Sequence, residues 1–188
     1  PVDNDMWCYQ SGWGNKIIAL SDTDDGATDT VYRFDLCSHT GTYIETAGHK
    51  LCGQHNLSDL PPSAFCRQRT VVIRVQPDAR ACITLSAFLA ALSAGLQTND
   101  MPSNVILASG WGSEHNHADY LPKAPWFEAQ LTDHIAGLGL HILGVDTPII
   151  DNQQQPYDAV KRLFETSPQC LLLAPCLLYT SDAADESV

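Results

Sequence analysis

The chain has 188 residues, of which 44% are hydrophobic, and its formal net charge is -12. This length supports a domain with a real hydrophobic core, and the hydrophobic content is ordinary for a globular protein. An acidic surface repels phosphate backbones, so we expect no nucleic-acid partner. No apolar run is long enough to span a bilayer, so we expect no membrane partner either.

The seven cysteines are scattered, and none forms a C-x-x-C pair. Isolated thiols without a disulfide framework are typical of a reducing compartment. No basic-then-apolar signal peptide opens the chain at Pro1. We therefore expect a cytoplasmic protein whose cysteines serve mainly as small buried hydrophobic residues.

The first third of the chain is predicted to be rich in β-structure. Apolar and β-branched runs predict strands over 16–20 and 31–37, separated by the aspartate-rich stretch 21–29. Several carboxylates close together could bind calcium, but their spacing is not that of an EF-hand loop, and no glutamate closes it. We interpret the stretch as a solvated loop.

The stretch 33–50 carries the clearest chemistry. His39, Tyr43, Glu45 and His49 all fall on odd positions, so in an extended chain they would share one face. Imidazole and carboxylate ligands together suit Zn, Mn or Fe. Gly41, between them, would let a metal or substrate approach the backbone closely. The alternative is a half-buried strand whose histidines are simply hydrogen-bonded.

Strands and helices alternate in the rest of the chain. We expect strands over 69–75, 104–109, 140–145 and 170–174, and helices over 84–96, over 126–138 and from Pro156. Thr84 is a good N-cap and Gly95 a plausible helix stop. The alternation predicts an α/β sandwich with parallel or mixed strand pairing.

The segment 39–49 resembles the signature of the Putative cyclase family, metal-dependent hydrolases that include bacterial arylformamidases (kynurenine formamidases) and isatin hydrolases. The family pattern reads His-x-Gly-Thr-His-x-Asp-x-Pro-x-His. Four positions match it, namely His39, Gly41, Thr42 and His49, and three depart from it, namely Tyr43, Glu45 and Ala47. The SGW segment at 109–111 and the GVDTP segment at 144–148 also resemble the family, in the right order.

The resemblance implies a swivelling β/β/α sandwich with a mixed sheet. It also implies a divalent metal, Zn or Mn, held by His39, Tyr43 and Glu45, with His49 as the general acid/base. The implied reaction is hydrolysis of a small amide, formamide or cyclic amide by a homo-oligomer. A phenol is a poor zinc ligand at neutral pH. The alternative is therefore that a water molecule binds the metal in place of Tyr43 and that Tyr43 lies next to that water. His115 and His117 are either extra ligands or part of a polar loop.

Residues 176–186, CLLYTSDAADE, resemble the translation of a sequencing adapter. We therefore expect a single cyclase-like domain over 1–175, cut short at its C-terminus, and a non-native tail over 176–188. Two alternatives to a working hydrolase stay open. One is a non-catalytic relative or inactive fragment that binds a small carbonyl ligand, and the other is an unrelated α/β domain whose motif is coincidental.

Overall fold

The computed structural model describes residues 4–66, 69–96 and 101–176, and the chain divides into two compact units. Unit 1 is Pro1–Tyr43 and unit 2 is Ile44–Val188. Within the described residues, no helix is both long enough and apolar enough to cross a membrane. The single domain expected over 1–175 stays a prediction, and the tail expected over 176–188 lies, apart from Cys176, outside the described residues.

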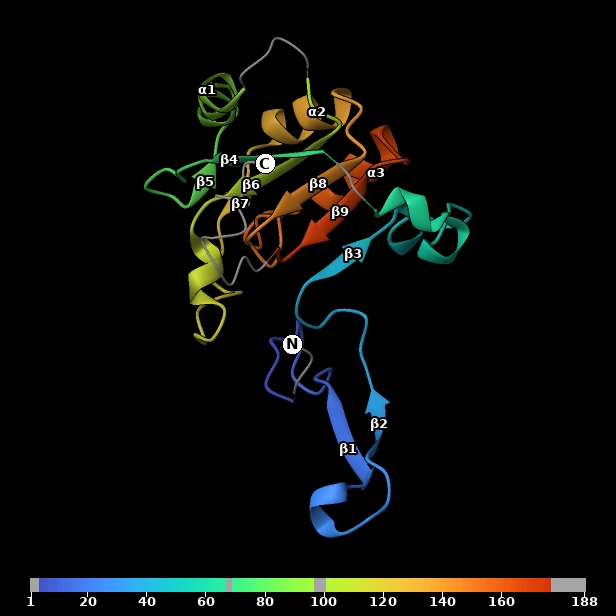
Figure 1. The fold of residues 1–188 in the computed structure, drawn as a ribbon. Helices are drawn as coiled ribbons and strands as arrows, with labels where there is room; N and C mark the ends of the chain where they lie inside the picture. Colours follow the sequence, from blue (N-terminus) through green and yellow to red (C-terminus); the bar gives the residue numbers. More distant parts are fainter. Residues whose placement is uncertain (1–3, 67–68, 97–100, 177–188) are drawn as a thin grey trace. The chain divides into compact units, whose positions relative to one another are not determined.

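Unit 1 contains one antiparallel hairpin, shown in blue in Figure 1. Its strands are β1 (Lys16–Ser21) and β2 (Val31–Asp35), which confirms both strands expected from the sequence. The aspartate-rich stretch forms the turn η1 (Thr23–Asp25), where the Asp22 side chain accepts a hydrogen bond from the Asp24 amide. This stretch is therefore a loop that is capped by its own carboxylate.

Unit 2 is built on a five-stranded sheet with the strand order β3-β9-β8-β6-β4. The strands are β3 (Tyr43–Glu45), β4 (Thr70–Arg74), β6 (Asn104–Ala108), β8 (Ile142–Val145) and β9 (Leu171–Ala174). The pairs β4–β6, β6–β8 and β8–β9 are parallel. In Figure 1, β3 runs opposite to β9, so the sheet is mixed, as the sequence predicted.

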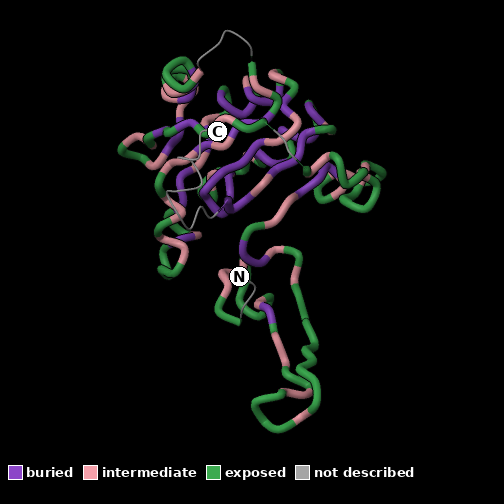
Figure 2. The backbone as a smooth tube through the Cα atoms, viewed as in Figure 1, coloured by how far each residue is buried: buried purple, intermediate pink, exposed green. Residues whose placement is uncertain are grey.

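Three helices connect the parallel strands. They are α1 (Leu85–Gly95), α2 (Ala129–Gly137) and α3 (Ala159–Thr166). The order β4, β6, β8, β9 always steps the same way across the sheet, and such crossovers are right-handed, so all three helices lie on one face. Figure 1 shows them along the same side, and Figure 2 shows the buried residues concentrated where helices and sheet meet.

Two of the expected helices start later than the sequence predicted. The helix expected over 126–138 begins only at Ala129, because Trp126 and Phe127 form the short strand β7 (Trp126–Phe127), which pairs with β5 (Cys82–Ile83). The helix expected from Pro156 begins at Ala159, after the N-cap Asp158. The Thr84 cap of α1 is confirmed, since its hydroxyl accepts from the Ala87 amide.

Short 3-10 turns occur in two of the connections between strands of the sheet. Besides η1, they are η2 (Ala47–His49), η3 (Leu57–Asp59), η4 (Pro62–Ala64) and η5 (Trp111–Glu114). The first three of these follow β3 directly, so the segment between β3 and β4 is a series of tight turns. That segment includes His49, the last residue of the candidate site.

Helix α3 begins against a second carboxylate besides its cap. Asp151 accepts hydrogen bonds from the amides of Ala159 and Val160, the first two residues of the helix. Burial nevertheless raises the pKa of Asp151, because desolvation disfavours the charged carboxylate more than these amides favour it. The carboxylate thus holds the helix start in place while paying a desolvation cost at neutral pH.

Two leucines of α1 allow a matched test of the core. Leu92 is 8% exposed and packs in the core, whereas Leu89, three residues earlier, is 43% exposed. We expect Leu92→Ala to lower the free energy of unfolding by about 2–5 kcal/mol, because it removes buried methyl groups and leaves a cavity. Leu89→Ala should change it by about 0.5 kcal/mol or less. Urea unfolding of both variants checks this, and equal losses would contradict the packing of α1.

The raised pKa of Asp151 predicts a pH dependence. A carboxyl whose folded-state pKa lies above its unfolded value of 3.8 contributes stability below that value and loses it as pH rises through the folded pKa. We expect the stability difference between parent and Asp151→Asn to shift in favour of the variant as pH increases from about 4 to 7. Urea unfolding of both proteins across this range measures it, and a constant difference would refute the prediction.

Candidate metal centre

The first candidate ligand, His39, lies in a loop of unit 1 that pairs with the start of the chain. The Gly41 amide donates to the Trp7 carbonyl at 2.7 Å, and the Tyr9 amide donates to the His39 carbonyl at 3.2 Å. Cys8 and Thr40, which lie between these two hydrogen bonds, pair as an isolated antiparallel β-bridge. The N-terminal segment therefore fixes the backbone on both sides of His39.

Gly41 has a specific steric reason to be glycine. Its φ is +60°, a conformation that L side chains rarely adopt, and a Cβ there would collide with the terminal methyl of Met6. The sequence suggested that this glycine admits a metal or substrate to the backbone. That expectation is wrong for the described conformation, because the Met6 side chain occupies the space.

The His39 imidazole is half-buried among polar and aromatic groups. Its Nδ1 lies 2.9 Å from the Ser38 hydroxyl oxygen. The ring of Tyr43 lies 4.7 Å from the imidazole, centroid to centroid, and that of Trp13 lies 6.2 Å away with its edge toward it. These contacts within unit 1 restrict the orientation of the imidazole, with Tyr43 packed directly against it.

Glu45 and His49 belong to unit 2, and only part of their predicted geometry is confirmed. Glu45 ends β3, but the chain then turns into η2 instead of staying extended to His49. The turn forms because the fully buried Ala47 offers its carbonyl to the amides of Lys50 and Leu51. His49 is therefore presented from a 3-10 turn. The expectation of one extended face over 39–49 holds only for β3 and is wrong on both sides of it, since Gly41 has a positive φ and 47–49 form η2.

A second glycine shapes this turn, and the sequence reading missed it. A Cβ on Gly48 would lie 2.5 Å from the Asn56 side-chain oxygen and 2.7 Å from the His55 carbonyl. The Gly48 amide donates to that same carbonyl at 3.0 Å. The 55–56 segment can therefore pack against the turn only because residue 48 has no side chain. This packing sets the position from which His49 projects.

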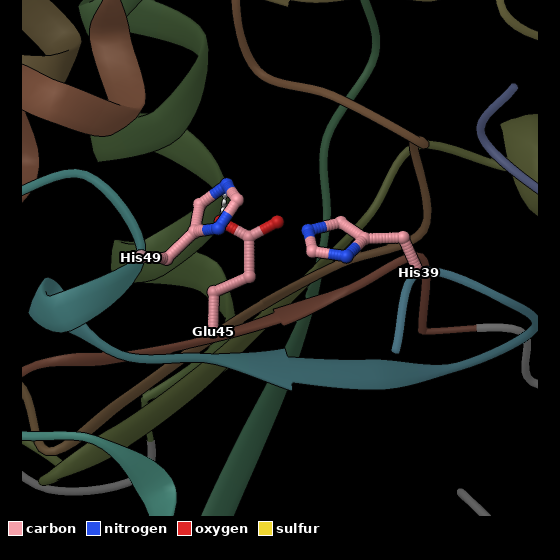
Figure 3. A group of neighbouring side chains, drawn as sticks. All are labelled: His39, Glu45 and His49. Carbon is pink, nitrogen blue, oxygen red and sulfur yellow. Dashed lines mark ion pairs between the residues drawn. The ribbon is translucent and has the colours of Figure 1, made fainter. Parts of the chain in front are cut away.

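Within unit 2, Glu45 and His49 form a carboxylate–imidazole pair, and Figure 3 draws this pair together with the third candidate, His39. Glu45 is 9% exposed, and its Oε2 lies 3.9 Å from His49 Nε2. Imidazole and carboxylate donors together suit Zn, Mn or Fe, so these residue types fit a divalent ion.

The other histidine candidates lie outside this group. His115 and His117 follow η5 in a loop of turns, so they do not share an extended face. The His115 Nδ1 lies 2.9 Å from the Gly112 carbonyl, and the His117 Nδ1 lies 3.7 Å from Glu114 Oε2. These local contacts favour the interpretation of a polar loop.

Two of the segments noted in the sequence meet in unit 2. The Asp146 carboxylate, at the end of β8, accepts from the Ser109 amide, the Ser109 hydroxyl and the Gly110 amide at 3.0, 2.6 and 2.7 Å. The Tyr120 hydroxyl donates to the Asp146 carbonyl at 2.9 Å. Hydrogen bonds to an ionised carboxylate are among the strongest in proteins, so Asp146 holds the loop after β6 against the end of β8.

Comparison with solved structures finds proteins with the same fold. One solved structure, a potential metal-dependent hydrolase with cyclase activity, has a TM-score of 0.72 at 15% identity, over 96% of this chain and 80% of that one. Another, a predicted metal-dependent hydrolase from Bacillus stearothermophilus, has a TM-score of 0.67 at 17% identity, over 96% and 81%. Isatin hydrolase A from Labrenzia aggregata, bound to benzyl benzoate, has a TM-score of 0.70 at 15% identity, over 92% and 76%.

At these identities the solved structures show the shared fold alone. No curated protein matches the chain. The family model described as Putative cyclase matches residues 1–152, a span that includes His39, Glu45, His49 and the Asp146 junction. The chain therefore belongs to the Putative cyclase family.

Proposed function

We propose that the protein is a metal-dependent hydrolase that cleaves a small amide, formamide or cyclic amide. The observation that carries this proposal is the Glu45–His49 pair in unit 2. A carboxylate that is only 9% exposed and has an imidazole 3.9 Å away has lost most of its hydration. Such a group calls for a nearby cation, either a protonated histidine or a metal ion.

The choice of substrate class rests on similarity. Among the solved structures with the same fold are an isatin hydrolase bound to the product analogue thioisatinate and isatin hydrolase A bound to benzyl benzoate. Those ligands are bound by those proteins and not by this chain. Together with the family match, they favour a small carbonyl compound over a peptide or a nucleic acid as the substrate.

We assign the residues as follows. His39 and Glu45 hold the ion. Tyr43 is either a third ligand or lies next to a water molecule that takes the third position. A bound divalent ion would supply an acidified water, whose pKa falls to near 7, and a Lewis acid for the carbonyl. His49 would hold the proton that the leaving nitrogen needs and deliver it there.

The position of His49 suits a proton carrier. Its side chain is 37% exposed, whereas that of Glu45 is 10% exposed, so the imidazole can reach solvent and substrate while the carboxylate stays covered. Glu45 also lies close enough to stabilise the imidazolium form electrostatically. A histidine that can take up and release a proton near neutral pH meets the requirement for amide cleavage.

A second candidate function is binding of a small carbonyl ligand without hydrolysis. The observation that favours it is Tyr43, which stands where the family pattern has histidine. Its ring packs at 4.7 Å on the His39 imidazole. Because a phenol ionises near pH 10, it is a weak zinc ligand at neutral pH. A site with fewer strong ligands would hold an ion less tightly.

The first prediction concerns metal content. We expect the full chain to retain about one ion per chain after incubation with Zn, Mn or Fe and removal of the unbound ion by desalting. Elemental analysis measures the retained ion. His39→Ala and Glu45→Gln should each weaken the affinity by about tenfold or more, because each removes a donor from the group. Circular dichroism of each variant should show that the fold survives.

His117→Ala is the matched control for this experiment. It removes another histidine that lies near a carboxylate, but one outside the proposed group. We expect it to bind metal as the parent does. A folded parent that retains none of the three ions after refeeding would rule out the metal-dependent hydrolase.

The second prediction separates the role of His49 from that of the ligands. We expect His49→Ala to keep its metal while losing about 100-fold or more of kcat on whichever formamide or cyclic amide the parent hydrolyses. Steady-state kinetics and elemental analysis on the same preparation measure both effects. If His49→Ala instead loses its metal together with its activity, then His49 is a ligand and another group must move the proton.

A further inference from the structure

The turn that carries His49 ends at Lys50, whose side chain reaches a helix that comes much later in the chain. Lys50 is the C-cap of η2, and its amide donates to the Ala47 carbonyl at 3.1 Å. Its Nζ lies 3.3 Å from Oδ2 of Asp158, the N-cap of α3, which is 108 residues further on. This partly exposed ion pair therefore lies one residue from the imidazole on which the proposed reaction depends.

The orientation of the Asp158 carboxylate is fixed by α3. Its Oδ1 accepts a hydrogen bond from the Lys161 amide at 2.7 Å, so one oxygen caps the helix while the other faces Lys50. Most surface ion pairs are weak in part because two flexible side chains must be held in one geometry. Here the helix cap has already ordered the acidic partner, so only the lysine side chain has to be ordered when the pair forms.

The start of α3 is itself held in place by Asp151. This partly buried carboxylate accepts hydrogen bonds from the amides of Ala159 and Val160. Burial raises the pKa of Asp151, and the nearby charge of Lys50 acts in the opposite direction. Lys50 thus lies in the field of two carboxylates, and both of them bond to the first turn of α3.

Packing joins η2 and α3 on their apolar side. Ala47, the first residue of η2, is fully buried in the core cluster that includes Ala159 and Val160 of α3, and the two elements are in contact. Hydrophobic burial holds them together, but it is not directional. The Lys50–Asp158 pair adds a directional contact at the end of the turn.

We propose that Lys50 and Asp158 are positioning residues for His49. Their ion pair ties the end of η2 to the capped start of α3, and so keeps the His49 imidazole beside Glu45. The inference rests on the proposed function, in which His49 delivers a proton. A displacement of about 1 Å can cost on the order of 100-fold in rate, so a contact that contributes little to stability can still matter for catalysis.

Two substitutions remove the ion pair and leave the helix cap in place. Asp158→Asn removes the negative charge, while asparagine caps a helix about as well as aspartate. Lys50→Met removes the positive charge and keeps an unbranched side chain. The two variants change the net charge in opposite directions, so an effect that they share cannot come from net charge.

Two further variants serve as controls. Lys50→Arg keeps the charge and is the conservative variant. Lys161→Met is the matched control, because it breaks another lysine–carboxylate pair, with Glu165 at 3.8 Å, on the exposed surface of α3.

The first measurement needs no enzymatic activity. The amides of Lys50 and Leu51 donate to the Ala47 carbonyl at 3.1 and 2.8 Å, so their hydrogen exchange reports the opening of η2. We expect Asp158→Asn and Lys50→Met to lower the protection factors of these amides about threefold or more, at an unchanged urea midpoint. The two control variants should keep the protection factors of the parent. Amide exchange followed by NMR measures this.

The second measurement is steady-state kinetics on whichever formamide or cyclic amide the parent hydrolyses. We expect the two charge-removing variants to lose about tenfold in kcat, with KM and metal content unchanged, because proton delivery contributes only in the transition state. Lys50→Arg should retain most of the parent's kcat, and Lys161→Met all of it.

Unchanged protection factors in both charge-removing variants would overturn the proposal whatever the activity, because the pair would then not hold the turn. Lower protection with an unchanged kcat would also contradict it, since His49 would not depend on the anchor. A change in KM alone would assign the pair to substrate binding instead. A parent that hydrolyses none of the substrates would refute the proposed function, and the catalytic role of the pair with it, while the protection factors would still show whether the pair holds η2.

Discussion

The candidate site depends on one buried charge, the carboxylate of Glu45. An ionised carboxylate with so little exposure is costly unless a cation stands close to it, and here the His49 imidazole lies 3.9 Å away. The local backbone brings the Glu45 and His49 side chains together. The buried Ala47 and the packing of Gly48 against the His55 carbonyl turn the chain sharply, so that residue 49 comes back beside residue 45.

The sequence predicted the elements well where one periodicity dominated. The parallel strands and α1 were expected close to their observed bounds, because β-branched runs and a well-capped apolar stripe leave few alternatives. It failed at residues 126–127, where the helical stripe of apolar residues gives way to β7. The bonds from the Trp126 amide to the Ala81 carbonyl, and from the Phe127 amide to the Ile150 carbonyl, come from distant segments and leave no local signal.

The same distinction applies to the site. Residue types and spacing grouped His39, Tyr43, Glu45 and His49 into one candidate site, with His39, Tyr43 and Glu45 as the implied ligands and His49 as the implied acid/base, but the face-sharing argument assumed an extended chain throughout. The structure brings Glu45 and His49 together by a 3-10 turn at a spacing of four residues, which is helical rather than extended. Gly41 was recognised as special but for the wrong reason, because its neighbour Met6 lies 35 residues earlier in a segment without a sequence signature.

The turn η2 has two supports that act in physically different ways. Gly48 lets the 55–56 segment pack closely against the turn, and a side chain at that position would destroy this steric contact. The Lys50–Asp158 pair is electrostatic and partly exposed, so its charges can be removed without disturbing the packing and at little cost in stability. Stability and geometry are therefore set by different contacts: the buried Ala47 holds η2 in the core, and the ion pair sets where the end of the turn lies. Because the two charges are 108 residues apart, no local pattern in the sequence connects them. Spacing along the chain can identify the reactive groups of a site, whereas the contacts that orient those groups come from segments that only the fold brings together.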